Sequence, residues 1–272
     1  MVTVRREGIP VLLLLFVLFP FQETLAGTKL ASHRAYYSAA IGEVKNTSQI
    51  VDANGGMVME LTESCEGWES VQGTRLVLLN SRGDEFLADV HYTSWESRDG
   101  LQFHFNYVHR SNGQIQEELL GRATFPARGE AGRVTFSKPS KTSLALPASV
   151  RFPTEHLLGL LEQAEAGTQI YEAPLYDGTK VDGLYDVNAF IGKPFIAKPA
   201  EGEASLGRLA GERGWPMRLA YFPFGTGDAV PEVEISIRLL ESGIAERMVF
   251  DHGDFTIIGT LERIDWLPQP DC

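Results

Sequence analysis

The sequence predicts a mainly β protein: one large antiparallel, meandering sheet, curled or partly closed into a barrel, with one or two packed helices. Two patterns recur along the chain, an alternation of apolar with polar residues and short turns that contain glycine. The alternation is typical of half-buried strands, and the turns are typical of hairpins. A third observation is one stretch that stands out by its helical spacing.

The alternation is clearest in residues 101–107 (LQFHFNY) and 233–239 (VEISIRL), where apolar side chains occupy every second position. Turn pairs that can supply a positive φ separate such runs. They are Asn54-Gly55, Asp99-Gly100, Asn112-Gly113, Asp177-Gly178 and Ser242-Gly243. Many strands joined by hairpins form a meander, and a sheet of more than about ten strands must curl, split or close.

The helical stretch begins near Pro153 or Thr154, residues that suit a first turn, and ends before Gly167, a suitable C-terminal stop. Its apolar residues repeat at helical spacing. They are Leu157, Leu160, Leu161 and Ala164. We expect this helix to cover one face of the sheet.

Residues 193–214 (KPFIAKPAEGEASLGRLAGERG) are rich in Gly, Ala and Pro and have little periodicity. We interpret them as a long surface connection, because glycine and proline interrupt regular structure. The strand patterns on both sides are alike, so the sequence predicts a single β-rich domain over residues 27–272.

The N-terminus has the pattern of a secretory signal peptide. Arg5 and Arg6 precede an apolar run of 13 residues, 9–21, and small residues then allow cleavage before Gly27. An uncleaved anchor is the alternative, but a membrane span needs about 20 apolar residues. We therefore predict that residues 1–26 are removed on export, which leaves no stable membrane insertion.

Two cysteines, Cys65 and Cys272, are the only ones in the 272 residues. Exported proteins meet an oxidising environment, so one intramolecular disulfide is the favoured interpretation, and two free thiols are the alternative. A catalytic thiol role is not indicated, because the chain has no Cys-x-x-Cys pair.

The formal net charge is −12. A chain this acidic repels nucleic acid and anionic membrane surfaces, so neither is an expected partner.

No motif of a hydrolase, metalloprotease, nucleotide-binding protein or dinucleotide-binding protein is present. We expect no enzyme activity, no catalytic residues, no cofactor and no metal. His91 and His104 with a carboxylate are one alternative for a metal site, but their spacing resembles no ligand motif. The cluster Asp251-His252-Gly253-Asp254 suits either a hard cation or a turn between strands, and the turn is favoured.

Neighbouring carboxylates occur in Glu117-Glu118 and Asp84-Glu85. Adjacent residues of a strand point to opposite faces, so these pairs are poor candidates for acid–base catalysis. Aromatic residues recur along the predicted strands. Most are expected in the core, although a curled sheet would leave some lining a cavity or groove. They include Trp68, Trp95, Trp215, Trp266, Phe222 and Phe224.

Several motifs occur together in an order that is specific, although each is weak alone. They are Ser64-Cys65-Glu66-Gly67-Trp68, Ser94-Trp95-Glu96, Phe152-Pro153-Thr154-Glu155-His156, Tyr176-Asp177-Gly178, Trp215-Pro216-Met217 and the ending Leu267-Pro268-Gln269-Pro270-Asp271-Cys272. In these motifs the chain, from about Leu30 to Cys272, resembles the EipB cell envelope integrity family.

The resemblance implies a periplasmic protein that folds as a β-spiral, with helices at the mouth of the curled sheet. It implies one disulfide between Cys65 and Cys272, and no established catalytic residues. It also implies a role in maintaining the envelope together with a periplasmic helical-repeat partner of the tetratricopeptide type.

The leading hypothesis is therefore a non-enzymatic scaffold or binding protein. A second is a carrier of an apolar envelope molecule in a β-lined cavity. A third is a cell-wall hydrolase, which needs two convergent carboxylates. Open sheet edges can pair between chains, so a homodimer is a further alternative.

Overall fold

A computed structural model describes residues 29–198 and 204–272. The predicted signal peptide, residues 1–26, lies outside the described residues. The described residues form one fifteen-stranded antiparallel sheet with an α-helix and a 3₁₀-helix, so the mainly β prediction is confirmed. No helix among these residues has the length and apolar character needed to cross a membrane.

The strands of the first half are β1 His33–Val44, β2 Ile50–Glu63, β3 Gly67–Asn80, β4 Glu85–Ser97, β5 Gln102–Ser111, β6 Gln114–Thr124, β7 Gly132–Lys138 and β8 Thr142–Leu146. The second half contains α1 Pro153–Glu165, β9 Ile170–Tyr176, β10 Leu184–Ile191, β11 Phe195–Ile196, η1 Ala204–Leu209, β12 Arg213–Pro223, β13 Val233–Leu240, β14 Ala245–Asp251 and β15 Phe255–Trp266.

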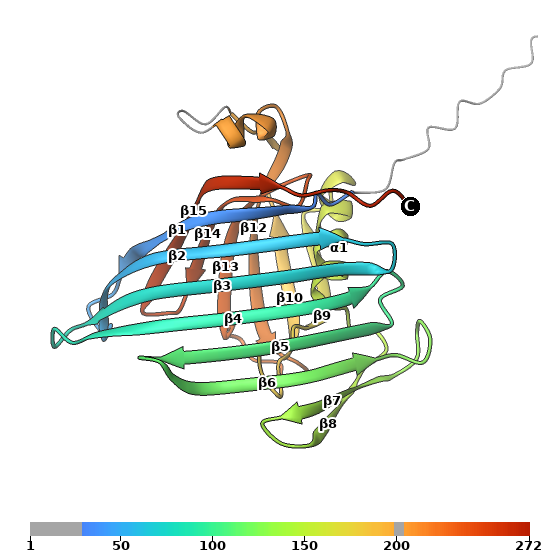
Figure 1. Ribbon diagram of the computed structural model, residues 1–272, viewed down its shortest axis with the longest axis horizontal. Helices are drawn as coiled ribbons and strands as arrows, with labels where there is room; N and C mark the ends of the chain where they lie inside the picture. The colour runs from blue at the N-terminus through green and yellow to red at the C-terminus, as the bar shows by residue number, and fades with distance from the viewer. Residues whose placement is uncertain (1–28, 199–203) are drawn as a thin grey trace, which may run out of the picture.

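The sheet is two meanders joined by its first and last strands. Strands β8 to β1 lie side by side in reverse chain order, β1 pairs with β15, and β14, β13, β12, β10 and β9 follow. The joining pair is in register from His33 opposite Trp266 to Val44 opposite Phe255, with two irregularities. In Figure 1, β1 to β6 form a front layer, and β10, β12 and β13 cross behind it at a steep angle. The sheet therefore curls on itself, and its two edges, β8 and β9, are not paired with each other.

The inner face of the curled sheet holds the core. Phe103 and Phe105 of β5 are buried while His104 and Asn106 are exposed, as the alternation predicts. Phe103 stacks on Phe152, just before α1, with ring centroids 4.9 Å apart. The apolar surface of the sheet thus faces the space between the two layers.

Helix α1 packs on this inner face with the predicted stripe. Leu160, Leu161 and Ala164 are buried in one cluster with Val187 of β10 and Leu219 of β12. The helix ends as expected, because Gly167 adopts a φ of 78°, a conformation that other residues rarely take.

The interpretation of residues 193–214 as a surface connection is wrong in part. The segment contains β11, which pairs with β12, and η1. Ala197, Leu206 and Leu209 are buried against the core. A two-residue strand and a six-residue 3₁₀-helix are too short to give a periodic pattern, so the sequence does not signal them.

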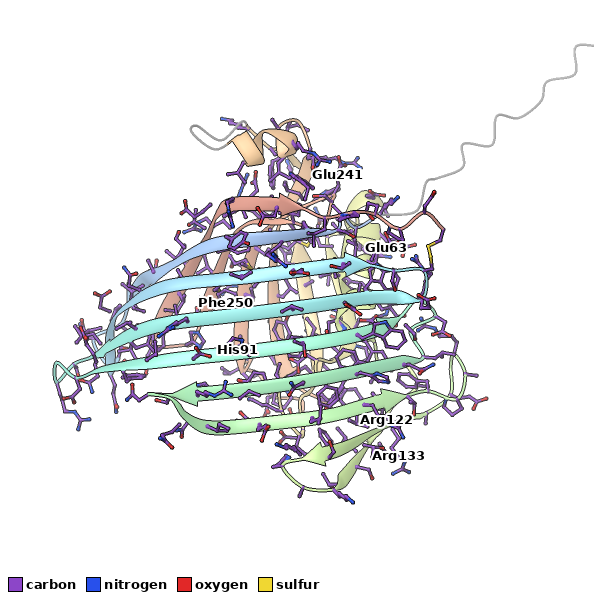
Figure 2. The ribbon with its side chains drawn as sticks, viewed as in Figure 1. Glu63, His91, Arg122, Arg133, Glu241 and Phe250 are labelled. Atoms are coloured by element: carbon purple, nitrogen blue, oxygen red, sulfur yellow. A yellow bond between two sulfur atoms is a disulfide. The ribbon has the colours of Figure 1, made fainter. Side chains whose placement is uncertain are left out.

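The structure joins the sulfurs of Cys65 and Cys272, whose Cα atoms lie 5.8 Å apart across a sequence separation of 207 residues. Figure 2 shows this bond at the end of the sheet where the C-terminus lies. Arg98 holds the Cys65 turn in place, because its guanidinium donates to the carbonyl oxygens of Ser64 and Cys65 and pairs with Glu63.

Candidate binding site

Two hollows lie on opposite faces of the curled sheet. The inner cavity has a volume of about 410 Å³ and lies between the two layers and α1. The outer groove has a volume of about 1070 Å³ and crosses strands β3 to β8.

The walls of the inner cavity are mostly apolar. Both layers and α1 contribute aliphatic side chains to it. Among them are Met59, Val90, Leu160, Leu219, Ile237 and Met248. A mostly apolar wall with a few polar groups is the usual composition of a small-molecule pocket.

Polar side chains of the inner cavity include Asp177, Thr179 and His156. Asp177 accepts hydrogen bonds from the amide and hydroxyl of Thr179, at 2.9 and 2.8 Å. Burial raises the pKa of Asp177 above its ordinary value and outweighs these bonds, which act in the opposite direction.

His156 of α1 is 3% exposed, and its Nε2 has no hydrogen-bond partner among the described residues. Burial lowers the pKa of His156 to about 4, with a smaller contribution from the charge of Arg151. The imidazole is therefore neutral at neutral pH and offers an unused polar atom beside an apolar space.

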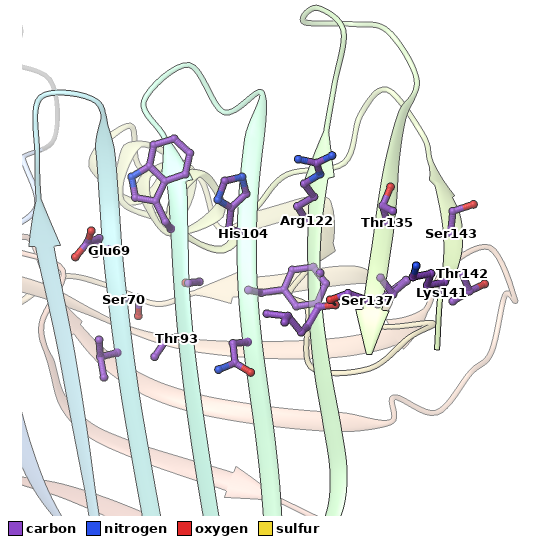
Figure 3. A pocket seen from close by; sticks show the side chains of 18 residues that line it. Glu69, Ser70, Thr93, His104, Arg122, Thr135, Ser137, Lys141, Thr142 and Ser143 are labelled. Atoms are coloured by element: carbon purple, nitrogen blue, oxygen red, sulfur yellow. Dashed lines mark hydrogen bonds between the residues drawn. The ribbon is translucent and has the colours of Figure 1, made fainter. Parts of the chain in front are cut away.

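The outer groove is built from one row of residues that face each other across six strands. The row runs from Glu69 of β3 through residues of β4 to β7 to Ser143 of β8. Its members in order are Glu69, Trp95, His104, Arg122, Thr135 and Ser143. Figure 3 shows His104, Arg122, Thr135 and Ser143 on successive strands. The next residues along these strands, such as Phe103 and Ala123, are buried, so the row lies on the face opposite the core.

Aromatic, apolar and basic side chains meet in this groove. The rings of Trp95 and His104 have centroids 5.3 Å apart. Val71 and Leu120 are 44% and 42% exposed, although both are aliphatic. The side chain of Arg122 lines the groove and has no hydrogen-bond or ion-pair partner among the described residues.

Hydroxyl groups and a second cation complete the lining. The hydroxyl residues are Ser70, Thr93, Ser94, Thr135, Ser137, Thr142 and Ser143. Lys141, in the β7–β8 turn, supplies the second cation, and Glu69 is the one carboxylate among the lining residues. The groove is therefore amphipathic and carries more positive than negative charge, although the chain has a net charge of −12.

The structure separates the two histidines considered for a metal site. His91 of β4 lies opposite Val108 of β5. Val108 is four residues from His104 along the same strand, a distance of about 14 Å. His91 instead contacts Asp89, with the Nε2 and Oδ1 atoms 2.9 Å apart. No group of three or more potential ligands that could hold a metal ion occurs within residues 29–198 and 204–272.

The acidic cluster and Glu118 of one carboxylate pair have structural roles. Asp251 accepts a hydrogen bond from the amide of Gly253, whose φ is 84°, so residues 252–254 form the turn between β14 and β15. Glu118 pairs with Lys138 at 2.7 Å. Each hollow is lined by one carboxylate, Glu69 outside and Asp177 inside, so neither contains the two that a glycoside hydrolase needs.

Sequence reasoning identified Trp95 and His104 but did not place them together, and it missed Arg122 and Lys141. The available signal was weak: Trp95, His104 and Arg122 occupy outward positions of three different strands, and Lys141 lies in a turn. Only the register between the strands brings Trp95, His104 and Arg122 into one row.

Comparisons with known proteins agree with the sequence and the fold. Residues 24–268 match the family described as EipB-like. The cell envelope integrity protein EipB of Brucella abortus (strain 2308) is 29% identical over 247 residues, which are 88% of this chain and 85% of that protein. The crystal structure of a beta-barrel-like protein of domain of unknown function DUF1849, also from Brucella abortus, is similar with a TM-score of 0.81. That similarity has 28% identity and covers 89% of this chain and 100% of the other.

Proposed function

The chain belongs to the EipB-like family, and from this premise we propose that it is a non-enzymatic periplasmic protein that supports cell envelope integrity by binding. In this proposal residues 1–26 are cleaved on export and residues 27–272 act as one domain. The bound partner is another envelope component or a periplasmic helical-repeat protein.

The observation that carries the proposal is the outer groove. Monomeric proteins rarely leave aliphatic and aromatic side chains together on an exposed sheet face without a partner. Here Val71, Leu120 and Trp95 line the same groove as Arg122, a side-chain cation without a partner among the described residues. A surface that combines apolar contact with unused charge suits recognition better than chemistry.

Complementation in cells lacking the gene tests this function. The deletion is expected to sensitise cells to detergent and to cell-wall inhibitors, and the wild-type chain restores resistance. A double variant of the groove, Trp95→Ala with Arg122→Ala, is expected to fail at wild-type abundance. The matched control, Ile115→Ala with Arg82→Ala, removes an exposed aliphatic side chain and an exposed arginine outside the groove and is expected to complement. A deletion strain with normal resistance would contradict the proposal.

A second candidate function, transport of an apolar envelope molecule, is favoured by the inner cavity. Its volume of about 410 Å³ is at the lower end of the range of ligand pockets, about 300–1,000 Å³, which suits a single acyl chain better than two. His156 Nε2 would accept a hydrogen bond from a polar head group.

Native mass spectrometry of the protein purified from periplasm tests the carrier function. The wild-type chain is expected to retain a single-chain amphiphile, and Met59→Trp, which fills the cavity, is expected to lose it. Val77→Trp places the same side chain on the exposed outer face and is expected to retain the ligand. A ligand-free wild-type protein would reject this candidate.

A further inference from the structure

The outer groove has the dimensions of a site for a chain molecule. Its row crosses six strands, from Glu69 to Ser143, and neighbouring strands lie about 4.8 Å apart. The row is therefore about 24 Å long, and it runs across the strands on the face of the sheet. A peptide that pairs with strands binds along a sheet edge through its backbone, so this direction does not suit one.

Sugars match the side chains of the groove. A pyranose ring has an apolar face of C–H bonds and a rim of hydroxyl groups. The indole of Trp95, beside the His104 ring, offers a flat surface for the apolar face. Asn106, Thr135 and Ser143 lie on the surrounding strands and can exchange hydrogen bonds with the rim.

The charges of the groove select among sugars. The lining includes two cations, Arg122 and Lys141, and one carboxylate, Glu69, and neither cationic side chain is paired with a described residue. A guanidinium recognises a carboxylate with two parallel hydrogen bonds. An uncharged glycan would leave both cations unused, whereas a glycan with carboxylates pairs with them.

We propose that the outer groove binds a linear glycan strand that bears carboxylate groups, the chemistry of cell-wall glycan strands whose peptides have been removed. The proposal rests on the binding function proposed above and names its ligand class. Hydrolysis is not part of it, because the lining has a single carboxylate. A lipid surface fits less well, because Ser and Thr hydroxyls outnumber the exposed aliphatic side chains.

Calorimetric titration of the mature chain tests the proposal with two probes of matched length. One is a set of peptidoglycan glycan strands from which the peptides have been removed, and which keep their lactyl carboxylates. The other is a set of uncharged chitin oligosaccharides. We expect binding of the carboxylated strands, at least tenfold weaker binding of the chitin oligosaccharides, and weakening of the former by salt.

Variants assign the binding to the groove. Trp95→Ala and Arg122→Glu are each expected to weaken binding of the carboxylated strands at least tenfold. Arg122 is exposed, so its substitution tests the groove even where loss of the half-buried indole disturbs folding. Ile115→Ala and Arg82→Glu, outside the groove, are expected to bind as the wild type does.

Three outcomes would overturn the proposal. They are no binding of the glycan strands at millimolar concentration, equal binding by Arg122→Glu, and binding of anionic vesicles or released peptides in place of the strands. Failure of the envelope function is a separate result. If a groove variant fails complementation while the wild type binds no glycan, the groove is still needed for the envelope function, and only the glycan is rejected as its ligand.

Discussion

The side-chain carboxylate of Glu96, in β4, accepts hydrogen bonds from the backbone amides of Thr154 and Glu155, at 2.7 and 2.8 Å. These amides belong to the first turn of α1, where helix N–H groups have no partner within the helix. Phe152, the residue at the N-cap, provides no side-chain hydrogen bond. The sheet therefore caps the helix, and a residue 58 positions away replaces the local cap.

We expect Glu96→Ala to lower the free energy of unfolding by at least about 2 kcal/mol, because two helix amides lose their acceptor. Chemical denaturation monitored by circular dichroism measures the change. Glu130→Ala removes an exposed carboxylate from the loop between β6 and β7 and serves as the control. A loss no larger than that of the control would mean that α1 does not depend on this contact.

The stripe of α1 gives a second prediction. Leu161 has no exposed surface, so Leu161→Ala is expected to lower the free energy of unfolding by about 2–5 kcal/mol, through lost contacts and the cavity that remains. Glu162→Ala changes the neighbouring exposed residue of the same helix and should have little effect. Equal stability of the two variants would show that the helix is not packed on the sheet in solution.

The cysteine pair gives a third prediction. A bond between Cys65 and Cys272 closes a loop with a sequence separation of 207 residues, for which chain entropy predicts a stabilisation of up to about 5 kcal/mol. Cys272→Ser and Cys65→Ser should therefore lower stability by similar amounts and leave the fold intact, because the sheet has its own core. Two free thiols per chain in the unreduced, denatured wild type, or a covalent dimer on a non-reducing gel, would contradict this prediction.

The sequence predicts those parts of the fold that depend on local patterns. Alternation in residues 101–107 predicts a strand with Phe103 and Phe105 buried, and the helical spacing after Pro153 predicts α1. These patterns exist because each element buries one face, and that face is set by the periodicity of the backbone. The curling of the sheet follows from the number of strands.

Contacts between distant residues escape such reasoning. The sequence pattern indicates only that Glu96 is a polar residue of a strand. Its role as a helix cap arises from the packing of α1 on the inner face of the sheet. The outer groove depends on a register that aligns Trp95 with His104 and His104 with Arg122. A shift of one residue in any strand would turn one of these side chains to the other face.

Glu96 and His156 lie near the same end of α1 and have pKa shifts that affect stability in opposite directions. Burial raises the pKa of Glu96 to about 7, against the hydrogen bonds from Thr154 and Glu155. Its contribution to stability is present below pH 4.5 and is lost as the pH rises to about 7. The lowered pKa of His156, about 4, gives a contribution that is present above pH 6.5 and is lost as the pH falls to about 4.

Between pH 4.5 and 6.5 the contributions of Glu96 and His156 to the unfolding free energy change in opposite directions with pH. They therefore largely cancel in the wild type, and single variants should separate them. From pH 4.5 to 7 the wild type should lose about 3 kcal/mol of unfolding free energy relative to Glu96→Gln. This figure follows from the raised pKa of Glu96, at about 1.36 kcal/mol per pKa unit. For His156→Gln the difference should change by a similar amount in the opposite sense from pH 4 to 6.5. Urea denaturation across pH 4–8 measures both differences in unfolding free energy, and Glu130→Gln controls for the loss of one carboxylate from the net charge.

The other titrating groups are common to all variants, so their contributions cancel in each difference. A difference that stays constant with pH for either variant would show that burial does not shift that group as the structure implies.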